Sequence, residues 1–344
     1  MMHTLLSPIA VLAALSMLSS PVQFPPLPEV PELTAGAWIV VDTESGISLL
    51  ESNADEERAM ASVTKLMTAL VVRDHADLDE RVRISETAAD VGEAEIGLVA
   101  GEVWSVRDLL AAVLVRSGND AAYALAEHVG DDLEGFAALM NEKAVAMGLT
   151  HSHFVNPHGL DADGHYTSAR DLTEMAKAAL EDDVLKQLTR TGFIRFKPAP
   201  NGADRLAINT NLLLNKYPGV VGMKTGYTGD AGRVLVSVLE ADGQVFVGVV
   251  MGSENHFADT ATLFNYVTAR LTIRDRFLAP LVEPEGGGGA VGASLDADIE
   301  KVVKTRQPLA NGREALSAWG ETPGTRRIVE MVRAMLPVTL GGSG

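Results

Sequence analysis

The chain has 344 residues, a formal net charge of −18 at pH 7 and no cysteine. This acidic balance argues against a nucleic-acid binder and against adsorption to anionic lipid, because both need an excess of Lys and Arg. The lack of cysteine excludes disulfides, thiolate nucleophiles and cysteine metal sites, while 47% hydrophobic residues are enough to build a folded core.

The amino-terminal segment predicts export. Residues 5–18 form an apolar run, which is shorter than the roughly 20 residues of a membrane span and typical of a signal-peptide core. We therefore expect a signal peptide or N-terminal anchor in residues 1–20. A Pro-rich spacer is expected in residues 21–34.

The sequence pattern of residues 37–180 predicts a β-hairpin followed by helices. Residues 37–42 and 47–51 flank a turn and predict two paired strands. A helix is expected from Ser62 to about residue 74, and a second one opens at Ser105 with the pattern of a capping box. That helix breaks at residues 117–119, where Asn119 or Asp120 is expected to cap the next helix. Further helices are predicted for residues 133–147 and 168–180.

Strands dominate the second half. The predicted segments are 192–197, 205–208, 220–224, 233–240 and 244–251, with Asp242-Gly243 as a hairpin turn between the last two. A helix is expected at 257–272. Because strands lie at both ends and helices between them, the fold class is α+β, and the catalytic domain is placed at residues 35–281.

The carboxy-terminal part divides into a Gly-rich linker and tail, 282–324, and an amphipathic helix, 325–337. The apolar stripe of that helix consists of Ile328, Met331, Val332, Met335 and Leu336, and three arginines line its other side. Two fates stay open: docking on the catalytic body, or contact with a membrane surface.

A first motif that can carry chemistry is Ser62-Val63-Thr64-Lys65. One helical turn places both polar side chains on the same face. A serine hydroxyl becomes a good nucleophile when a base takes its proton, and a lysine buried near a second cation is neutral enough to be that base. Taken alone, however, the motif reads as a helix cap followed by a solvated lysine.

Two further motifs follow in chain order. Ser117-Gly118-Asn119 lies between two helices, where a hydroxyl and an amide can relay a proton and hold a substrate amide. Lys224-Thr225-Gly226 ends an apolar strand, where a cation and a hydroxyl suit a carboxylate and glycine leaves room for a ligand backbone. Each of these is also an ordinary turn or strand end when taken by itself.

Together the three motifs resemble the S-x-x-K, S-D-N and K-T-G signature of the serine penicillin-binding protein and β-lactamase superfamily. The flanking sequence is similar to that of low-molecular-mass D-alanyl-D-alanine carboxypeptidases over residues 35–272. The stretches that carry this likeness are 61–69, 117–130, 154–161, 165–172, 209–214 and 222–233. The resemblance implies a β-lactamase/transpeptidase-like fold, with an antiparallel sheet flanked by helices and a helical subdomain.

The resemblance also implies a function and a set of roles. It implies a serine DD-peptidase that acts on peptidoglycan stem peptides ending in D-Ala-D-Ala, needs no cofactor or metal, and is acylated by β-lactams. Ser62 would be the nucleophile, Lys65 the base, Ser117 a proton relay, and Asn119 a ligand of the substrate amide or of Lys65. The implied substrate-binding residues are Lys224, Thr225, Gly226 and Tyr227, with the N–H groups of Ser62 and Tyr227 as the oxyanion hole.

The sequence departs from the superfamily pattern in three places. The middle motif is Ser-Gly-Asn, and no Glu-x-x-Leu-Asn segment occurs, so a β-lactamase is disfavoured. Glu93-Ala94-Glu95 stands where relatives often have small polar residues, which affects the rim of the substrate site.

The sequence is also compatible with other functions. A DD-endopeptidase or transpeptidase of the same fold, or a penicillin-binding sensor without turnover, would share these motifs. A metallopeptidase is suggested by His151, His153, His158, Asp161 and His165, although the same histidines also fit hydrogen-bonded loop positions. Finally, a ligand with a carboxylate end requires a locally positive cleft at Lys65 and Lys224 within the acidic body.

Overall fold

The computed structural model describes residues 28–214 and 216–273. The expected leader, the linker and the C-terminal amphipathic helix lie outside these residues. The chain divides into two compact units. Residues 30–268 belong to the larger one, and the described residues of the smaller one are 28, 29 and 269–273. Among the described helices, none combines the length and the apolar character needed to cross a bilayer.

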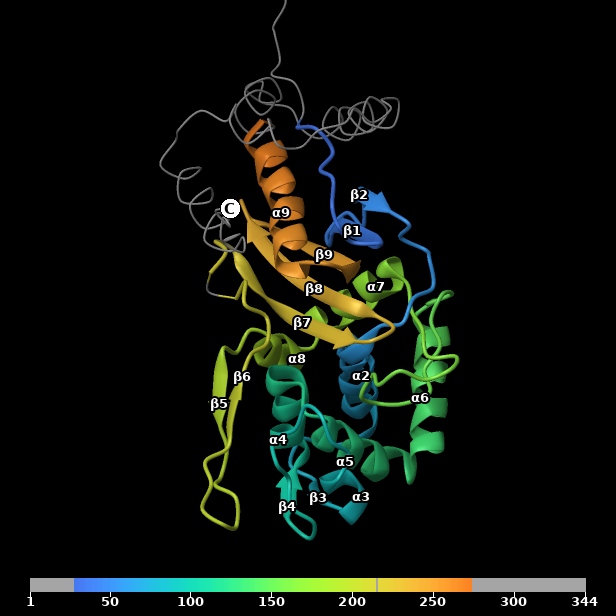
Figure 1. Cartoon of the computed structure of the whole chain (residues 1–344), viewed down its shortest axis with the longest axis vertical. Coiled ribbons are helices and arrows are strands. Elements are labelled where there is room, and N and C mark those ends of the chain that lie inside the picture. The colour runs from blue at the N-terminus through green and yellow to red at the C-terminus, as the bar shows by residue number, and fades with distance from the viewer. Residues whose placement is uncertain (1–27, 215, 274–344) are drawn as a thin grey trace, which may run out of the picture. The chain divides into compact units, whose positions relative to one another are not determined.

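The centre of the larger unit is a five-stranded antiparallel sheet in the order β2-β1-β9-β8-β7 (Figure 1). Its strands are β1 (Ala37–Asp42), β2 (Ser48–Ser52), β7 (Val220–Thr228), β8 (Gly232–Ala241) and β9 (Gln244–Ser253). Strand β1 pairs with β9, so the first and last strands of the domain meet as the α+β prediction requires. The predicted hairpins at residues 43–46 and at Asp242-Gly243 are both confirmed.

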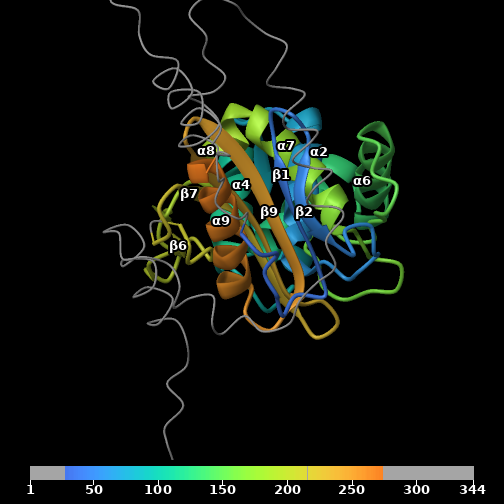
Figure 2. The ribbon, with the colours of Figure 1, turned by 90° about the horizontal axis from the view of Figure 1, so that it is seen from above.

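Helices cover both faces of this sheet (Figure 2). On one face, α9 (His256–Ile273) lies against β9, where a side chain at Gly248 would collide with the ring of Phe264. On the other face, α7 (Ala169–Glu181) packs against β1, β8 and β9, and the neighbouring α8 covers Asp183–Thr189. The alternation of β9 explains the two layers, because Val247 and Val249 join the main core while Gly248 faces α9.

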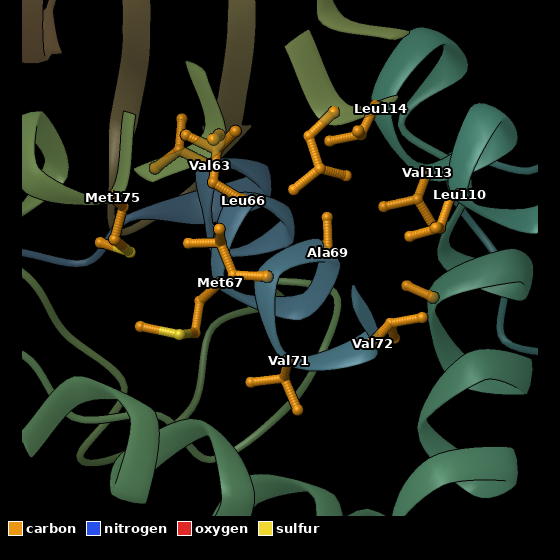
Figure 3. Packing of buried hydrophobic residues seen from close by; sticks show 14 of the residues in the cluster. Val63, Leu66, Met67, Ala69, Val71, Val72, Leu110, Val113, Leu114 and Met175 are labelled. Atoms are coloured by element: carbon orange, nitrogen blue, oxygen red, sulfur yellow. The ribbon is translucent and has the colours of Figure 1, made fainter. Parts of the chain in front are cut away.

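A helical subdomain surrounds the helix α2 (Lys65–His75), of which residues 65–72 are all buried. It contains α4 (Val106–Ala111), a π-helical turn η2 (Ala112–Arg116), α5 (Asn119–Gly130) and α6 (Leu133–Ala146). In Figure 3, apolar side chains of α2 such as Leu66 and Met67 lie between Leu114 and Met175 from neighbouring helices. This packing holds the first motif in a rigid core.

Short elements that the sequence pattern does not predict complete the fold. They are β3 (Arg81–Arg83), α3 (Glu86–Ala89) and β4 (Val103–Ser105). The helix expected from Ser62 begins only at Lys65, because residues 61–64 form the separate 3₁₀ turn η1 (Ala61–Thr64). The predicted segments 192–197 and 205–208 form a separate two-stranded hairpin of β5 (Phe193–Arg195) and β6 (Leu206–Ile208).

Two predictions of local structure are wrong. Neither Asn119 nor Asp120 caps α5, because the residue before the helix is Gly118 and no side chain caps it. The side chains of both residues are instead used in tertiary hydrogen bonds. The Lys224-Thr225-Gly226 motif lies inside β7 rather than at its end, since the strand continues to Thr228. Strand β7 is, as predicted, an edge strand of the sheet.

Candidate active site

Ser62 lies on the tight 3₁₀ turn η1, directly before the buried helix α2. The preceding residue, Ala61, has φ +51°, a left-handed conformation that costs a non-glycine residue about 1 kcal/mol. The Thr64 hydroxyl donates to the Ala61 carbonyl at 2.8 Å and fixes this turn. Ser62 is half-buried, whereas the turn around it is buried, so its hydroxyl is the accessible polar group of the motif.

Two glycines allow the surrounding chain to approach this turn. A Cβ atom on Gly226 of β7 would lie 2.9 Å from the Ala61 Cβ and 3.0 Å from the Ser62 nitrogen. A Cβ atom on Gly159, which has φ +89°, would lie 2.0 Å from the Ala61 oxygen. Gly226 thus makes room for the chain's own serine turn, a reason for glycine that the sequence prediction of space for a ligand backbone did not include.

Lys65 is fully buried and directs its amine at three oxygens. The Lys65 Nζ atom is 3.0 Å from Ser62 Oγ, 2.7 Å from Asn119 Oδ1 and 2.6 Å from the His158 carbonyl. A neutral amine has two N–H bonds and one lone pair. The amide and the carbonyl can accept the two N–H bonds, which leaves the lone pair for the Ser62 hydroxyl.

The surroundings favour that neutral form. Burial lowers the pKa of Lys65 well below its ordinary value, and the charge of Lys224 lowers it further. The carboxylates of Asp120 and Glu93 act in the opposite direction. Lys65 thus lies within hydrogen-bond distance of Ser62 Oγ, and its pKa is shifted in the direction that a base requires.

The wall opposite β7 is built by residues 117–119. Ser117 ends η2 in a left-handed conformation, φ +69°, and its Oγ accepts a hydrogen bond of 2.8 Å from Lys224 Nζ. Asn119 donates from its side chain to the Gly92 carbonyl at 3.1 Å and from its backbone to the Ala94 carbonyl. Both Ser117 and Asn119 are buried, so their geometry is fixed by the fold.

Asp120 supports this wall, a role that sequence reasoning missed. Its buried carboxylate accepts hydrogen bonds from the backbone N–H groups of Ile96, Gly97 and Leu98 at 3.0–3.3 Å. It thereby holds the loop whose Gly92 and Ala94 carbonyls anchor Asn119. An acid directly after the Ser-Gly-Asn motif was the available signal, but it also fitted a helix cap.

Strand β7 supplies the other side of the site. Lys224 is buried and bonded to Ser117, and burial lowers its pKa to about 7. Thr225 donates from its hydroxyl to Thr210 Oγ1 at 2.6 Å, a partner that sequence reasoning also missed. Tyr227 is 68% exposed beside Arg233. Since Gly226 touches the serine turn, the backbone of Tyr227 follows beside Ser62.

The structure thus brings all three motifs together, and it sharpens the electrostatic prediction. Lys65 and Lys224 are both buried beside the three motifs, with Lys65 bonded to Ser62 and Asn119, and Lys224 bonded to Ser117. Burial lowers the pKa of both lysines, however, and the charge of Lys224 lowers that of Lys65 further.

The histidines near the site occupy hydrogen-bonded loop positions. His165 Nε2 is 2.8 Å from Thr64 Oγ1, and its Nδ1 accepts from the Val155 N–H at 3.0 Å. His158 Nδ1 accepts from the Leu160 N–H at 3.2 Å. Between residues 28 and 273, position 215 aside, no three His, Asp or Glu side chains gather in a way that could hold a metal ion.

A comparison with protein families matches residues 25–255 to a family described as D-alanyl-D-alanine carboxypeptidase, Peptidase_S11. The chain is 36% identical over 224 residues to D-alanyl-D-alanine carboxypeptidase DacF of Bacillus subtilis, covering 64% of this chain and 57% of that protein. It is 34% identical over 246 residues to DacB2 of Mycobacterium tuberculosis, covering 69% and 83%. The chain therefore spans less than two thirds of the length of DacF.

Solved structures show the same likeness. The crystal structure of the Streptomyces K15 DD-transpeptidase matches with a TM-score of 0.66 and 30% identity, covering 70% of this chain and 98% of that one. The D-alanyl-D-alanine carboxypeptidase of Mycobacterium tuberculosis H37Rv matches with a TM-score of 0.66 and 30% identity, covering 78% and 99%. The prediction of a transpeptidase/β-lactamase-type fold is confirmed.

Proposed function

Because the chain belongs to the D-alanyl-D-alanine carboxypeptidase family Peptidase_S11, we propose that it removes the terminal D-Ala from peptidoglycan stem peptides through an acyl-enzyme on Ser62. The observation that carries this proposal is the contact of 3.0 Å between Ser62 Oγ and the buried amine of Lys65. A hydroxyl beside an amine whose pKa is lowered is an activated nucleophile. β-Lactams would acylate the same oxygen.

Acylation would proceed as follows. Lys65 takes the proton of the Ser62 hydroxyl while Oγ attacks the carbonyl of the penultimate D-Ala. The N–H groups of Ser62 and Tyr227 stabilise the negative charge on the carbonyl oxygen. The peptide bond then breaks, and the departing amine of the terminal D-Ala takes up a proton. Water finally hydrolyses the ester and regenerates the Ser62 hydroxyl.

Ser117 is suited to pass the proton to the departing amine. Its Oγ already accepts a hydrogen bond from Lys224 at 2.8 Å, so its own hydroxyl proton remains to be donated. Lys224 and Thr225 would bind the carboxylate of the terminal D-Ala. In the structure Thr225 donates to Thr210, and this hydroxyl would turn toward the substrate carboxylate on binding.

Of the two roles that the resemblance implies for Asn119, the geometry supports the positioning of Lys65 most directly. Its Oδ1 accepts from Lys65 at 2.7 Å, and one N–H of its amide is used by the Gly92 carbonyl. The second N–H of the same amide is left for a carbonyl of the substrate.

This substrate places the enzyme outside the cytoplasm, and the apolar run of residues 5–18 fits an export signal. We therefore propose a leader or anchor in residues 1–20, a spacer in 21–34 and a catalytic domain in 35–281. The tail, 282–324, would lead to the helix of residues 325–337, and either this helix or the N-terminal segment would provide any membrane contact.

The test is mass analysis of D-Ala release from a pentapeptide muropeptide, with Ser62→Ala as control. We expect release by the wild type, none by Ser62→Ala, and covalent labelling by a fluorescent penicillin in the wild type alone. Labelling without release would favour a sensor, and release that survives Ser62→Ala but not a chelator would favour a metal enzyme. Transfer to an added amine, in place of hydrolysis, would favour a transpeptidase.

A further inference from the structure

Glu93 lies on the rim of the site in a constrained backbone position. The carbonyl before it, of Gly92, accepts from the Asn119 side chain at 3.1 Å, and the carbonyl after it, of Ala94, accepts from the Asn119 backbone. Asn119 in turn bonds Lys65 at 2.7 Å. Glu93 is thus fixed on both sides to the residue that holds Lys65.

Glu93 has two features that are unfavourable, one for the stability of the backbone and one for the proposed role of Lys65. Its φ of +64° is a left-handed conformation, which costs a non-glycine residue about 1 kcal/mol. Its carboxylate also opposes the loss of a proton from Lys65, the group we propose as the base. Places where a chain departs from such local preferences are often functional sites.

The side chain of Glu93 is available for a ligand. It is exposed, and within the described residues it forms no hydrogen bond or ion pair. Glu95, its neighbour on the loop, is different, because its carboxylate accepts from the Gly92 N–H at 2.7 Å and shapes the turn. Glu93 therefore presents a free negative charge beside the cleft.

The proposed substrate brings a group of opposite charge to this rim. With the terminal carboxylate on Lys224 and Thr225 and the scissile carbonyl at Ser62, the chain upstream of the two D-Ala residues leaves the cleft on the side away from the carboxylate. An extended peptide advances only about 3.4 Å per residue. Residues 92–94 border the site through their bonds to Asn119, and we take the third residue of the stem to pass this rim within reach of a long side chain.

We propose that Glu93 is a specificity-determining residue that binds the side-chain ammonium of the stem-peptide residue preceding D-Ala-D-Ala. The enzyme then prefers stems in which this residue is a diamino acid with a free amine over stems in which the amine is acylated. This inference rests on the proposed function, since it assigns a contact to the substrate of that reaction.

The test compares two peptides that differ by one charge, Nα-acetyl-L-Lys-D-Ala-D-Ala and Nα,Nε-diacetyl-L-Lys-D-Ala-D-Ala. A partly exposed ion pair is worth up to about 1 kcal/mol, or about fivefold in a rate constant. We expect kcat/KM for D-Ala release to be about three- to fivefold higher for the free amine in the wild type. In Glu93→Gln the ratio should fall to about one, and in Glu93→Gly, which also relieves the left-handed backbone, it should fall equally.

The matched control is Glu86→Gln, which removes one negative charge from another exposed glutamate of the same segment. The net charge of −18 could attract any cationic peptide, and such steering would weaken equally in both Gln variants. We expect Glu86→Gln to keep the wild-type ratio. Equal ratios in the two variants, or no preference in the wild type, would overturn the inference. Failure to release D-Ala from either peptide would instead refute the proposed function.

Discussion

The buried imidazoles of His158 and His165 should make the catalytic domain sensitive to mild acid. Each ring uses Nδ1 as an acceptor for a backbone N–H, from Leu160 and Val155 respectively, which only the neutral ring with its proton on Nε2 can do. Burial lowers the pKa of His158 to about 3 and that of His165 to about 4. Both rings therefore stay neutral in the folded protein at a pH where an unfolded chain binds protons.

The sign and size of the effect follow from linkage. The ordinary histidine pKa is 6.5, so below this pH the unfolded state binds more protons than the folded state, and the free energy of unfolding falls. At about pH 5 the unfolded chain gains about 2 kcal/mol per histidine, so the two together remove about 4 kcal/mol. The ordinary pKa values of Asp and Glu, 3.8 and 4.5, lie below pH 5. Most of the loss between about pH 7.5 and pH 5 therefore comes from histidines and not from carboxyl groups.

The assay is urea unfolding at about pH 7.5 and about pH 5, compared for the wild type, His165→Gln and His75→Gln. Gln at position 165 can still accept from the Val155 N–H but does not titrate, so about 2 kcal/mol of the pH-dependent loss should disappear. His256, whose pKa burial also lowers to about 4, contributes to the loss that remains. His75 is exposed, so the control should keep the wild-type difference. The reasoning is refuted if the wild type is equally stable at both values, or if His165→Gln retains the full loss.

Three other changes test the geometry of the site. Gly226→Ala would place a Cβ 2.9 Å from the Ala61 Cβ. We expect penicillin acylation to slow at least about fivefold, the rate equivalent of about 1 kcal/mol at the low end of the roughly 1–3 kcal/mol that overpacking costs; an unchanged rate would contradict this. In the wild type, kcat/KM for a carboxylate-terminated peptide should decline above about pH 7 as Lys224 loses its charge, and Lys224→Arg should remove that decline; a decline that persists would exclude Lys224 as its source. Arg205 is buried and bonded to Glu102 and to the Gly97 carbonyl, so Arg205→Met should lower stability by about 3–5 kcal/mol in thermal unfolding, whereas Arg195→Met, on the same hairpin but exposed, should change it by less than about 1 kcal/mol; equal effects would argue against the buried pair.

The sequence predicted well those helices and strands that are determined by the pattern of neighbouring residues. Helices 133–147 and 168–180 have apolar periodicity and acceptors at their starts, and Asp132 and Ser168 do cap α6 and α7. The meeting of the three motifs in one site was also predicted. This prediction came from the resemblance to a known family, because local sequence patterns do not indicate which distant segments are in contact. The α+β class followed from strands at both ends of the domain.

The errors lie where a tertiary contact overrides a local preference. Aspartate is a common helix cap, and this made Asp120 a candidate for the cap of α5. Its carboxylate instead accepts hydrogen bonds from three backbone N–H groups of a loop more than twenty residues upstream. The contact of Gly226 with the serine turn joins residues more than 160 positions apart, so no local pattern indicates it. The His158 carbonyl that bonds Lys65 is a backbone group, so no side-chain pattern could have indicated it.

The two lysines of the cleft pose one electrostatic problem, since the proposed reaction needs Lys65 neutral and Lys224 charged while burial favours the neutral form of both. For Lys65, the charge of Lys224 lowers the pKa in addition to burial, whereas burial is the cause for Lys224. A substrate carboxylate on Lys224 would stabilise the charged form of that lysine and leave the neutral form to Lys65. The bound carboxylate thus favours the charged form of Lys224, and this charge in turn favours the neutral form of Lys65.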